Sequence, residues 1–242
     1  MRKSFPTDEG GIEVLAGVDL VARQGEFVAV VGPSGCGKST LLAILAGIEP
    51  PSGGEVLLDG EPVTGRAGRF AYMPQSDVLL DWRRVLDNAT LGLEIRGMPR
   101  REARAKVEPL LETFGLAGFE RAYPFQLSGG MRQRVALLRT VAQEQGVLLL
   151  DEPLGALDAL TRRDMQIWLE SVWERFRWTV VLVTHDIREA VYLADTVYVL
   201  SPRPASICRG VAVDLPRPRT PQSASSPRAL ELEAELLATL GG

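Results

Sequence analysis

Residues 32–40 read GPSGCGKST, and this stretch decides how the rest of the chain is interpreted. It fits the pattern of a glycine, four variable residues, a second glycine, a lysine and then serine or threonine. The apolar run FVAVV at 27–31 precedes it and is typical of a strand buried on both faces. The apolar run LLAILA at 41–46 follows it and indicates a buried helix that ends near Gly47. A phosphate-binding loop requires this order of strand, glycine-rich loop and helix.

The residue types in this loop suit a nucleoside triphosphate. Glycines let successive backbone N–H groups turn toward one anion, and the N-terminus of the next helix adds partial positive charge there. Lys38 is expected to reach the β- and γ-phosphates, and the Ser39 hydroxyl to ligate Mg²⁺. The alternative is an ordinary glycine-rich turn, which the complete pattern and both flanks disfavour. The residues expected to contact the nucleotide are Gly32, Pro33, Ser34, Gly35, Cys36, Gly37, Lys38, Ser39 and Thr40.

The composition of the 242 residues is ordinary for a globular protein, with 45% hydrophobic and 24% charged residues. The net charge of −4 argues against a nucleic-acid binder, which would carry a basic patch or stripe. No apolar run approaches the roughly 18 residues that a membrane-spanning helix needs, and the first residues lack the apolar segment of a signal peptide. We therefore expect a cytoplasmic chain, unless a partner holds it at a membrane.

Strand patterns alternate with helical patterns in the second half of the chain, which predicts a mostly parallel sheet covered on both faces. The strands are expected at 147–150, 179–183 and 196–200, and the helices at 159–175 and 187–193. The region from 77 to about 143 is helical in character and reads as an insertion, with amphipathic helices at 85–93 and 100–114. The opening stretch to Gly25 reads as β-structure, and 230–240 as a short amphipathic helix. The predicted fold class is α/β, with a P-loop NTPase core.

Chemically useful side chains follow two of the expected strands. Asp151 and Glu152 come directly after the apolar strand at 147–150, and His185 follows the strand at 179–184. Ligands of such sheets bind at the carboxyl ends of the strands, so these side chains are expected at one edge. Asp151 would hold Mg²⁺ and Glu152 would polarise an attacking water as general base. Acidic pairs on solvated turns and incidental single histidines are common, but the phosphate loop in the same chain favours the functional interpretation.

Residues 127–130, LSGG, begin another helix, with Ser128 as a natural N-cap. Taken alone, this could be an ordinary capped helix start. At this point, however, the chain resembles the ATP-binding subunits of ABC (ATP-binding cassette) transporters. LSGG resembles their signature motif, the phosphate loop their Walker A motif, and residues 147–152 their Walker B motif with its following glutamate. Gln75 lies at their Q-loop, residues 156–158 at their D-loop and His185 at their switch histidine, all in the order of the family.

The resemblance implies an arrangement that spacing alone cannot give. Two subunits would stack head to tail, with each ATP between the Walker A loop of one and the signature helix of the other. Ser128, Gly129 and Gly130 would contact the nucleotide of the partner, and Asp158 would link the two sites. Gln75 would touch Mg²⁺ and the water, and His185 would hold the γ-phosphate and Glu152.

The resemblance also implies one domain of residues 1–242. Its nucleotide-binding core would comprise 1–75 and 146–242, with an N-terminal antiparallel β-subdomain, and 76–145 would form the inserted α-helical subdomain that carries the signature motif. An aromatic residue near the N-terminus stacks on adenine in the family, and Phe5 is the candidate here. Because only four residues precede Phe5, a frayed chain end is the alternative.

Residues 81–88, DWRRVLDN, and 215–219, LPRPR, resemble importers for nitrate, sulfonates and taurine, and importers for thiamine-precursor pyrimidines look similar. Trp82 could equally be a core residue of the helical insertion. The expected function is ATP hydrolysis that powers import through a separate membrane permease. The partners would be a second copy of the chain, the permease and, indirectly, a solute-binding protein, at the cytoplasmic face of the membrane.

Two other classes of protein share the phosphate loop. An ABC-type ATPase that acts on nucleic acid or ribosomes would usually have coiled coils, tandem cassettes or basic surfaces, which this sequence lacks. A P-loop phosphotransferase would need an acceptor site and would have no use for LSGG. Co-purification distinguishes these classes, because membrane subunits support the first function and DNA or ribosomes the second.

Overall fold

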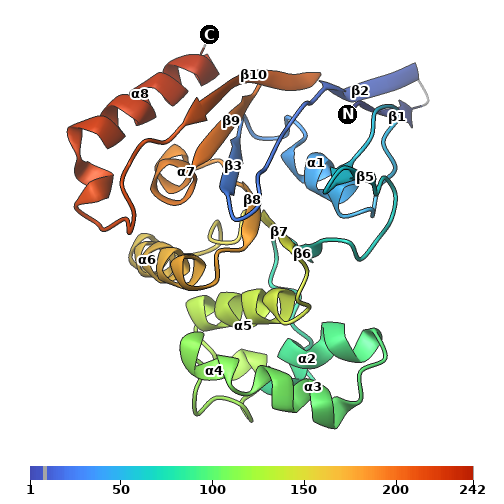
Figure 1. The fold of residues 1–242 in the computed structure, drawn as a ribbon, viewed down its shortest axis with the longest axis vertical. Helices are drawn as coiled ribbons and strands as arrows, with labels where there is room; N and C mark the ends of the chain where they lie inside the picture. Colours follow the sequence, from blue (N-terminus) through green and yellow to red (C-terminus); the bar gives the residue numbers. More distant parts are fainter. Residues whose placement is uncertain (8–9, 242) are drawn as a thin grey trace.

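The computed structural model describes residues 1–7 and 10–241, and within these ranges eight strands form one sheet (Figure 1). The strand order is β1-β2-β10-β9-β3-β8-β7-β6. The centre of the sheet is the fully buried β3 (Phe27–Val31), which pairs in parallel with its two neighbours β8 (Thr179–Val183) and β9 (Thr196–Leu200). Two further parallel strands extend the sheet on one side, β7 (Val147–Asp151) and β6 (Ala71–Met73). The predicted α/β fold with a mostly parallel sheet is confirmed.

The other side of the sheet is largely antiparallel and includes the N-terminus. β10 (Ala205–Ala212) pairs antiparallel with β9 and in parallel with β2 (Gly10–Gly17), which in turn pairs antiparallel with β1 (Lys3–Thr7). The expected N-terminal antiparallel β-structure is therefore present, but it ends at Gly17 and joins the main sheet through a strand from the C-terminal third. A separate two-stranded hairpin consists of β4 (Leu57–Leu58) and β5 (Glu61–Pro62).

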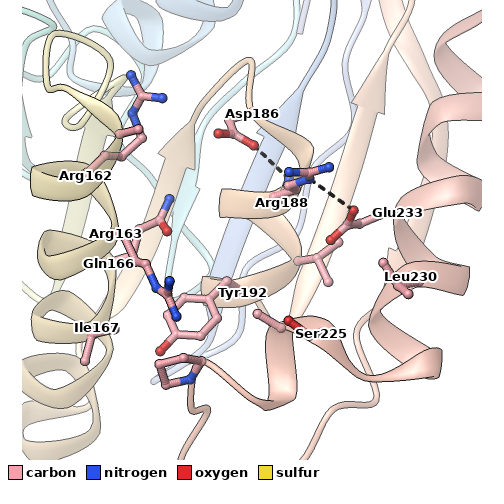
Figure 2. Close-up of a pocket in the computed structure, with 14 residues that line it drawn as sticks. Arg162, Arg163, Gln166, Ile167, Asp186, Arg188, Tyr192, Ser225, Leu230 and Glu233 are labelled. Carbon is pink, nitrogen blue, oxygen red and sulfur yellow. Dashed lines mark hydrogen bonds and ion pairs between the residues drawn. The ribbon is translucent and has the colours of Figure 1, made fainter.

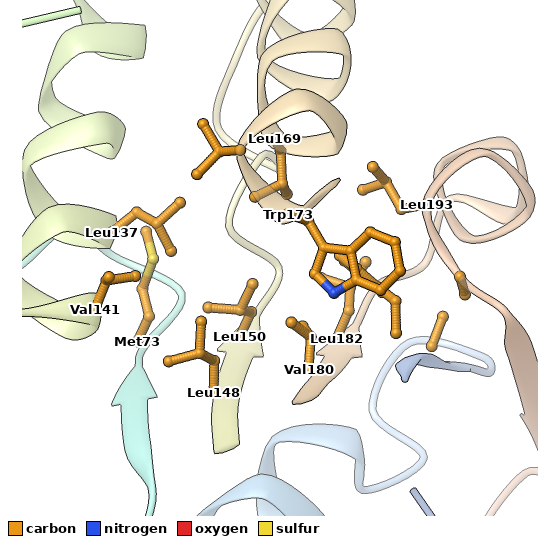
Figure 3. Close-up of a cluster of buried hydrophobic side chains, with 14 of the residues drawn as sticks. Met73, Leu137, Val141, Leu148, Leu150, Leu169, Trp173, Val180, Leu182 and Leu193 are labelled. Atoms are coloured by element: carbon orange, nitrogen blue, oxygen red, sulfur yellow. The ribbon is translucent and has the colours of Figure 1, made fainter. Parts of the chain in front are cut away.

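Helices cover both faces of the sheet because its central strands are apolar on both sides. Alternate residues of β8 face opposite ways: Val181 and Val183 pack in the cluster that contains α1 (Lys38–Leu45). Val180 and Leu182 pack in a second cluster, which Figure 3 shows, beneath α6 (Ala159–Phe176), α7 (Ile187–Leu193) and α8 (Pro227–Gly241). The helix expected at 230–240 thus begins earlier, at Pro227, where a missing N–H costs nothing.

Trp173 of α6 lies at the middle of this second cluster and is 1% exposed. Its ring meets that of Phe27 edge to face, with centroids 5.9 Å apart. The guanidinium group of Arg217 lies 3.9 Å from the centroid of the indole. The indole N–H donates to the carbonyl oxygen of Trp178 at 2.8 Å, so the polar end of this large side chain is satisfied. Trp173 of α6 therefore packs against both the central strand β3 and the segment that precedes α8.

The helical insertion forms the lower part of the molecule in Figure 1. It contains α2 (Val85–Ile95), α3 (Arg100–Val107), α4 (Leu110–Thr113), a short 3₁₀ helix at Pro124–Gln126 and α5 (Gly129–Val141). The prediction of a single helix over 100–114 is wrong, because Pro109 has no N–H and interrupts the hydrogen-bond ladder between α3 and α4. Trp82 is 76% exposed, so its interpretation as a core residue is also wrong.

Within the described residues, no helix is both long and apolar enough to cross a membrane. A second 3₁₀ helix (Ser223–Ser225) lies in the segment before α8.

Candidate functional site

The phosphate loop turns sharply between β3 and α1, as its glycines predicted. Gly35 and Gly37 have positive φ angles of 74° and 122°, in the region that favours glycine. A Cβ atom on Gly37 would also lie 2.8 Å from Cγ1 of Val14, so this position excludes a side chain for two reasons. Helix α1 begins directly after the loop, at Lys38. The loop therefore presents the free N–H groups of a helix N-terminus next to a lysine side chain.

The Lys38 ammonium group is held inside this loop. Its Nζ donates to the carbonyl oxygens of Gly32 at 2.9 Å and Pro33 at 3.0 Å, and the residue is 6% exposed. Cys36 is buried, whereas Ser34 and Gly35 are exposed at the loop tip. The expected anion-binding residues are thus together in space, with the cation at their centre.

The next residue, Ser39, meets the end of β7. Its hydroxyl donates to Oδ1 of Asp151 at 3.1 Å, and the hydroxyl of Tyr72 lies 3.4 Å from Oδ2 of the same carboxylate. Burial raises the pKa of Asp151, and its hydrogen bonds to Ser39 and Tyr72 oppose that rise. Burial, together with the Asp151 charge, raises the pKa of Tyr72 to about 12. A hydroxyl and a carboxylate at this spacing are hard oxygen donors of the kind that would suit Mg²⁺.

Glu152 lies between two of the other predicted site residues. Its Oε2 is 3.1 Å from Nδ1 of His185 and accepts a hydrogen bond from Nε2 of Gln75 at 3.3 Å. The three residues come from the ends of β7, β8 and β6, which are neighbours in the sheet. The prediction that these strand ends share one edge is confirmed, and a carboxylate, a histidine and an amide group meet there.

The backbone at Glu152 is unusual, because its φ is +43° and left-handed conformations are uncommon outside glycine. Its N–H donates to the carbonyl oxygen of Val183 at 2.9 Å, and its own carbonyl accepts from the N–H of Gly155 at 3.1 Å. These two backbone hydrogen bonds hold the main chain at Glu152 in place and so limit where its carboxylate can lie. Strain of this kind is concentrated at functional sites.

The signature segment lies at a different place. Ser128 caps α5, accepting from the N–H of Met131 at 3.3 Å, and Asp158 caps α6, accepting from Leu160 and Thr161 at 3.1 Å. The two helix starts are packed together, because a Cβ on Gly130 would lie 2.9 Å from Cγ2 of Thr161. No hydrogen bond between described residues joins Ser128, Gly129, Gly130 or Asp158 to the phosphate loop.

Phe5 is part of β1 and pairs with Ile12 of β2. Its ring packs beside the α1 cluster, and Nζ of Lys3 lies 4.5 Å from its centroid. The alternative of a frayed end is therefore wrong, while the role in adenine stacking remains a prediction.

Two residues near the site were missed by the sequence analysis. Tyr72 stands three positions before Gln75 on β6, and only the pairing of that strand with β7 brings its hydroxyl to Asp151. Arg203 lines a hollow of about 390 Å³ beside the tip of the phosphate loop. No local signal could have indicated Arg203, because the polar segment after β9 reaches the loop only through the tertiary fold.

Comparison with known proteins agrees with this geometry. The family description "ABC transporter" matches residues 15–155. The chain is 46% identical over 219 residues to the uncharacterized ABC transporter ATP-binding protein MJ0412 of Methanocaldococcus jannaschii, covering 90% of this chain and 82% of that protein. It is 46% identical over 237 residues to the aliphatic sulfonates import ATP-binding protein SsuB of Pseudomonas entomophila, covering 98% of this chain and 82% of that protein.

A solved structure shares the fold as well as the sequence. The dimeric bacterial ABC transporter cassette MJ0796 superposes with a TM-score of 0.75 at 31% identity, covering 88% of this chain and 96% of that one. A second structure of MJ0796 is described as a post-hydrolysis state bound to ADP and Pi, with the same similarity. Together with the phosphate loop and the strand-end carboxylates, these matches show that the chain belongs to the ABC transporter family and is an ATPase.

Proposed function

We propose that the chain is the ATP-hydrolysing subunit of an importer that moves a small sulfonate-like solute through a separate membrane permease. The observation that carries the ATPase part is the meeting of Glu152, His185 and Gln75 at one edge of the sheet, next to the phosphate loop. The importer part is supported by several SsuB relatives, among them one from Ralstonia nicotianae at 50% identity over 210 residues. Nitrate and pyrimidine solutes are the alternatives within the same type of importer.

In this proposal the phosphate loop binds the triphosphate before hydrolysis. Backbone N–H groups of the loop and the Lys38 ammonium group surround the β- and γ-phosphates. Ser39 and Asp151 hold Mg²⁺, which when bound neutralises charge on the phosphate oxygens. The Lys38 side chain is already directed into the loop by two carbonyl groups, so it needs little rearrangement to meet a phosphate.

Glu152 acts as the general base in this proposal. Its carboxylate accepts a proton from the water that attacks the γ-phosphorus, and the bond from the γ-phosphorus to the bridging oxygen breaks as ADP leaves. Nδ1 of His185 lies close enough to Glu152 to orient the carboxylate, and the Gln75 amide group supports it from the other side. The left-handed backbone at Glu152 and the bond from its N–H to Val183 hold the residue at this position.

The remaining predicted site residues act on the nucleotide of a second copy. Among the described residues, no hydrogen bond connects the phosphate loop to the signature segment or the D-loop of the same chain. The residues concerned are Ser128, Gly129, Gly130 and Asp158. The α5 start offers N–H groups beside glycines, which suits an anion brought by a partner. The description of MJ0796 as a dimeric cassette supports the dimer, and the head-to-tail stacking is part of this proposal. Phe5 is proposed to stack on the adenine ring.

The permease and a solute-binding protein complete the proposed importer, and place the chain at the cytoplasmic face of the membrane. Trp82 lies exposed at 76% in the segment between Gln75 and α2 that resembles sulfonate-type importers. A tryptophan of this exposure suits a contact with another protein. No nucleic-acid partner is proposed.

The test of the ATPase mechanism is the substitution Glu152→Gln. It keeps the size of the side chain and one acceptor oxygen but removes the base, so we expect ATP turnover to fall by about 10²–10⁴-fold. Mg-ATP binding should be preserved, and the variant should form a dimer in saturating ATP, as size-exclusion chromatography would show. Glu112→Gln is the matched control, since Glu112 is exposed on α4. Wild-type turnover in Glu152→Gln would refute the base assignment, and a monomer at saturating ATP would refute the stacked dimer.

The solute is tested separately, with the permease and binding protein that co-purify with the chain. ATP hydrolysis by the reconstituted complex should be stimulated by an aliphatic sulfonate and its binding protein. Stimulation by nitrate or a pyrimidine instead would correct the solute, and co-purification with ribosomes or DNA would refute the importer.

A further inference from the structure

A hollow of about 490 Å³ lies away from the phosphate loop, between α6, α7, the Ser223–Ser225 helix and α8. We call it the α6–α8 pocket (Figure 2). Its volume is within the usual range for small-molecule sites. The ion pair between Arg188 of α7 and Glu233 of α8, at 3.5 Å, crosses it. Nothing in the sequence or the proposed ATPase mechanism assigns a role to this pocket.

The charges around the pocket favour an anion. Its lining contains three arginines and two carboxylates, namely Arg162, Arg163, Arg188, Asp186 and Glu233, and Glu233 pairs with Arg188. Within the part of the chain that the structure describes, Arg162 donates only to neutral carbonyl oxygens. Arg163 is exposed and takes part in no hydrogen bond or ion pair with another described residue. Positive charge at the pocket is therefore left in excess.

Apolar side chains line the pocket as well. Ile167 of α6, Val191 of α7 and Leu230 of α8 line it, and Leu230 is 55% exposed. The ring of Tyr192 forms part of the floor, and Figure 2 shows the Arg163 side chain extending toward it. Burial raises the pKa of the Tyr192 phenol, and the charge of Arg163 counters this shift, which agrees with their proximity. A guanidinium group beside apolar walls suits a ligand with an anionic head and an apolar body.

The pocket also contacts the segment that precedes α6. Arg162 lines the pocket, and its guanidinium group donates to the carbonyl oxygens of Leu157 at 2.7 Å, Leu154 at 3.3 Å and Gly155 at 3.5 Å. These carbonyls belong to the turn between Glu152 and Asp158. A ligand packed against Arg162 would therefore restrain the turn that follows the proposed base.

We propose that the α6–α8 pocket binds an amphipathic organic anion, with its charged head on Arg163 and its apolar body toward Leu230, and that occupancy acts on ATP hydrolysis through Arg162. This site is separate from the nucleotide site and from the transported solute, and binding to it does not require the importer function to be correct.

The probe is octane-1-sulfonate at concentrations below micelle formation, titrated by calorimetry into the full-length chain saturated with Mg-ADP. Because Mg-ADP then occupies the phosphate loop, the measured heat excludes binding of the sulfonate at that loop. We expect one site, and no binding of octylammonium, which has the same body and the opposite charge. Loss of a charge-assisted hydrogen bond in Arg163→Ala should weaken octane-1-sulfonate by about 10-fold or more. Leu230→Glu places a like charge at the exposed apolar end and should weaken it as well.

The matched control is Arg101→Ala, which removes an exposed arginine of α3 that has no hydrogen bond or ion pair with another described residue. It should leave octane-1-sulfonate binding within about 2-fold of wild type. The proposal is overturned if octylammonium binds equally well, if no sulfonate binds at millimolar concentration, or if Arg163→Ala and Leu230→Glu bind like Arg101→Ala.

The second part is tested by turnover. Saturating octane-1-sulfonate should change the ATP hydrolysis rate of the wild type at least about 2-fold, and should leave the rate of Arg163→Ala unchanged. The coupling through Arg162 would be overturned if octane-1-sulfonate binds to the wild type, and this binding is lost in Arg163→Ala, but the wild-type rate of ATP hydrolysis does not change.

Discussion

Replacing Glu189 with glutamine should change how the stability of the protein depends on pH. Glu189 of α7 is 3% exposed, and its Oε2 accepts a hydrogen bond from Oγ1 of Thr184 at 2.5 Å. Its other carboxyl oxygen has no hydrogen-bond partner among the described residues. Burial raises the pKa of Glu189 to about 7, and the charges of Asp186 and Glu152 add to this rise, while the Thr184 hydrogen bond and Arg162 oppose it. Burial thus outweighs the groups that favour the ionised carboxylate.

The size and sign of the effect follow from this pKa. The rise from 4.5 to about 7 corresponds to about 3 kcal/mol of unfolding free energy. The folded protein binds this proton more tightly than the unfolded chain, so the contribution is fully present below pH 4.5 and is lost as the pH rises to about 7. Glu189→Gln keeps an acceptor for Thr184 and removes the titration. The variant should therefore gain about 2 kcal/mol relative to wild type between about pH 5 and about pH 8.

Urea unfolding of both proteins at intervals across this range measures the gain. The buried amide group of the variant adds an offset that does not vary with pH, so the slope of the difference is the relevant quantity. Glu112→Gln serves as the control, because it removes an exposed carboxylate and should give a nearly flat difference. A flat difference for Glu189→Gln would mean that Glu189 ionises normally in the folded protein, and the reasoning from its burial would fail.

Three further substitutions test other parts of the structure. Lys38→Ala removes the ammonium group from the phosphate loop, so the Kd for Mg-ATP by calorimetry should rise about 10-fold or more; an unchanged Kd would refute its role. Trp173→Ala removes the indole that packs on Phe27 and should lower the unfolding free energy by about 3–5 kcal/mol, and a loss below about 1 kcal/mol would show that the cluster collapses around the space. Gly37→Ala places a methyl group 2.8 Å from Val14 on a backbone at φ +122°. It should cost at least about 1 kcal/mol and weaken nucleotide binding, and unaltered urea unfolding would contradict this.

The sequence could predict the shared edge of the site because parallel strands bring their carboxyl ends together. Asp151, Glu152 and His185 were placed by their positions after apolar strands, and the sheet brings Glu152 and His185 within 3.1 Å. Gln75 was placed by resemblance alone, since the short β6 gives a weak local pattern. The strand-end rule and the resemblance to the family therefore predicted site residues at the same edge of the sheet.

Features that depend on distant packing could not be predicted in this way. β10 links the N-terminal hairpin to the main sheet, but its residues 205–212 show no clear alternation that would distinguish a strand from a loop. The exposure of Trp82 was likewise undecided, because an apolar residue in a helical region is more often buried. Pro109, by contrast, was a readable signal, and the amphipathic pattern on both sides of it led to the prediction of one continuous helix.

The backbone directs the adjacent carboxylates Asp151 and Glu152 toward different partners. Asp151 is the last residue of β7 and its side chain reaches Ser39, on the side of the nucleotide loop. At Glu152 the chain leaves the strand with φ +43°, while its N–H still donates to the carbonyl oxygen of Val183, the β8 residue that pairs with Asp151. The carboxylate consequently points to His185 instead of to Ser39. The main chain sets the direction in which the side chain at position 152 leaves the strand, so Glu152→Gln should stay beside His185, and a loss of turnover in this variant would support the proposed role of Glu152 as base.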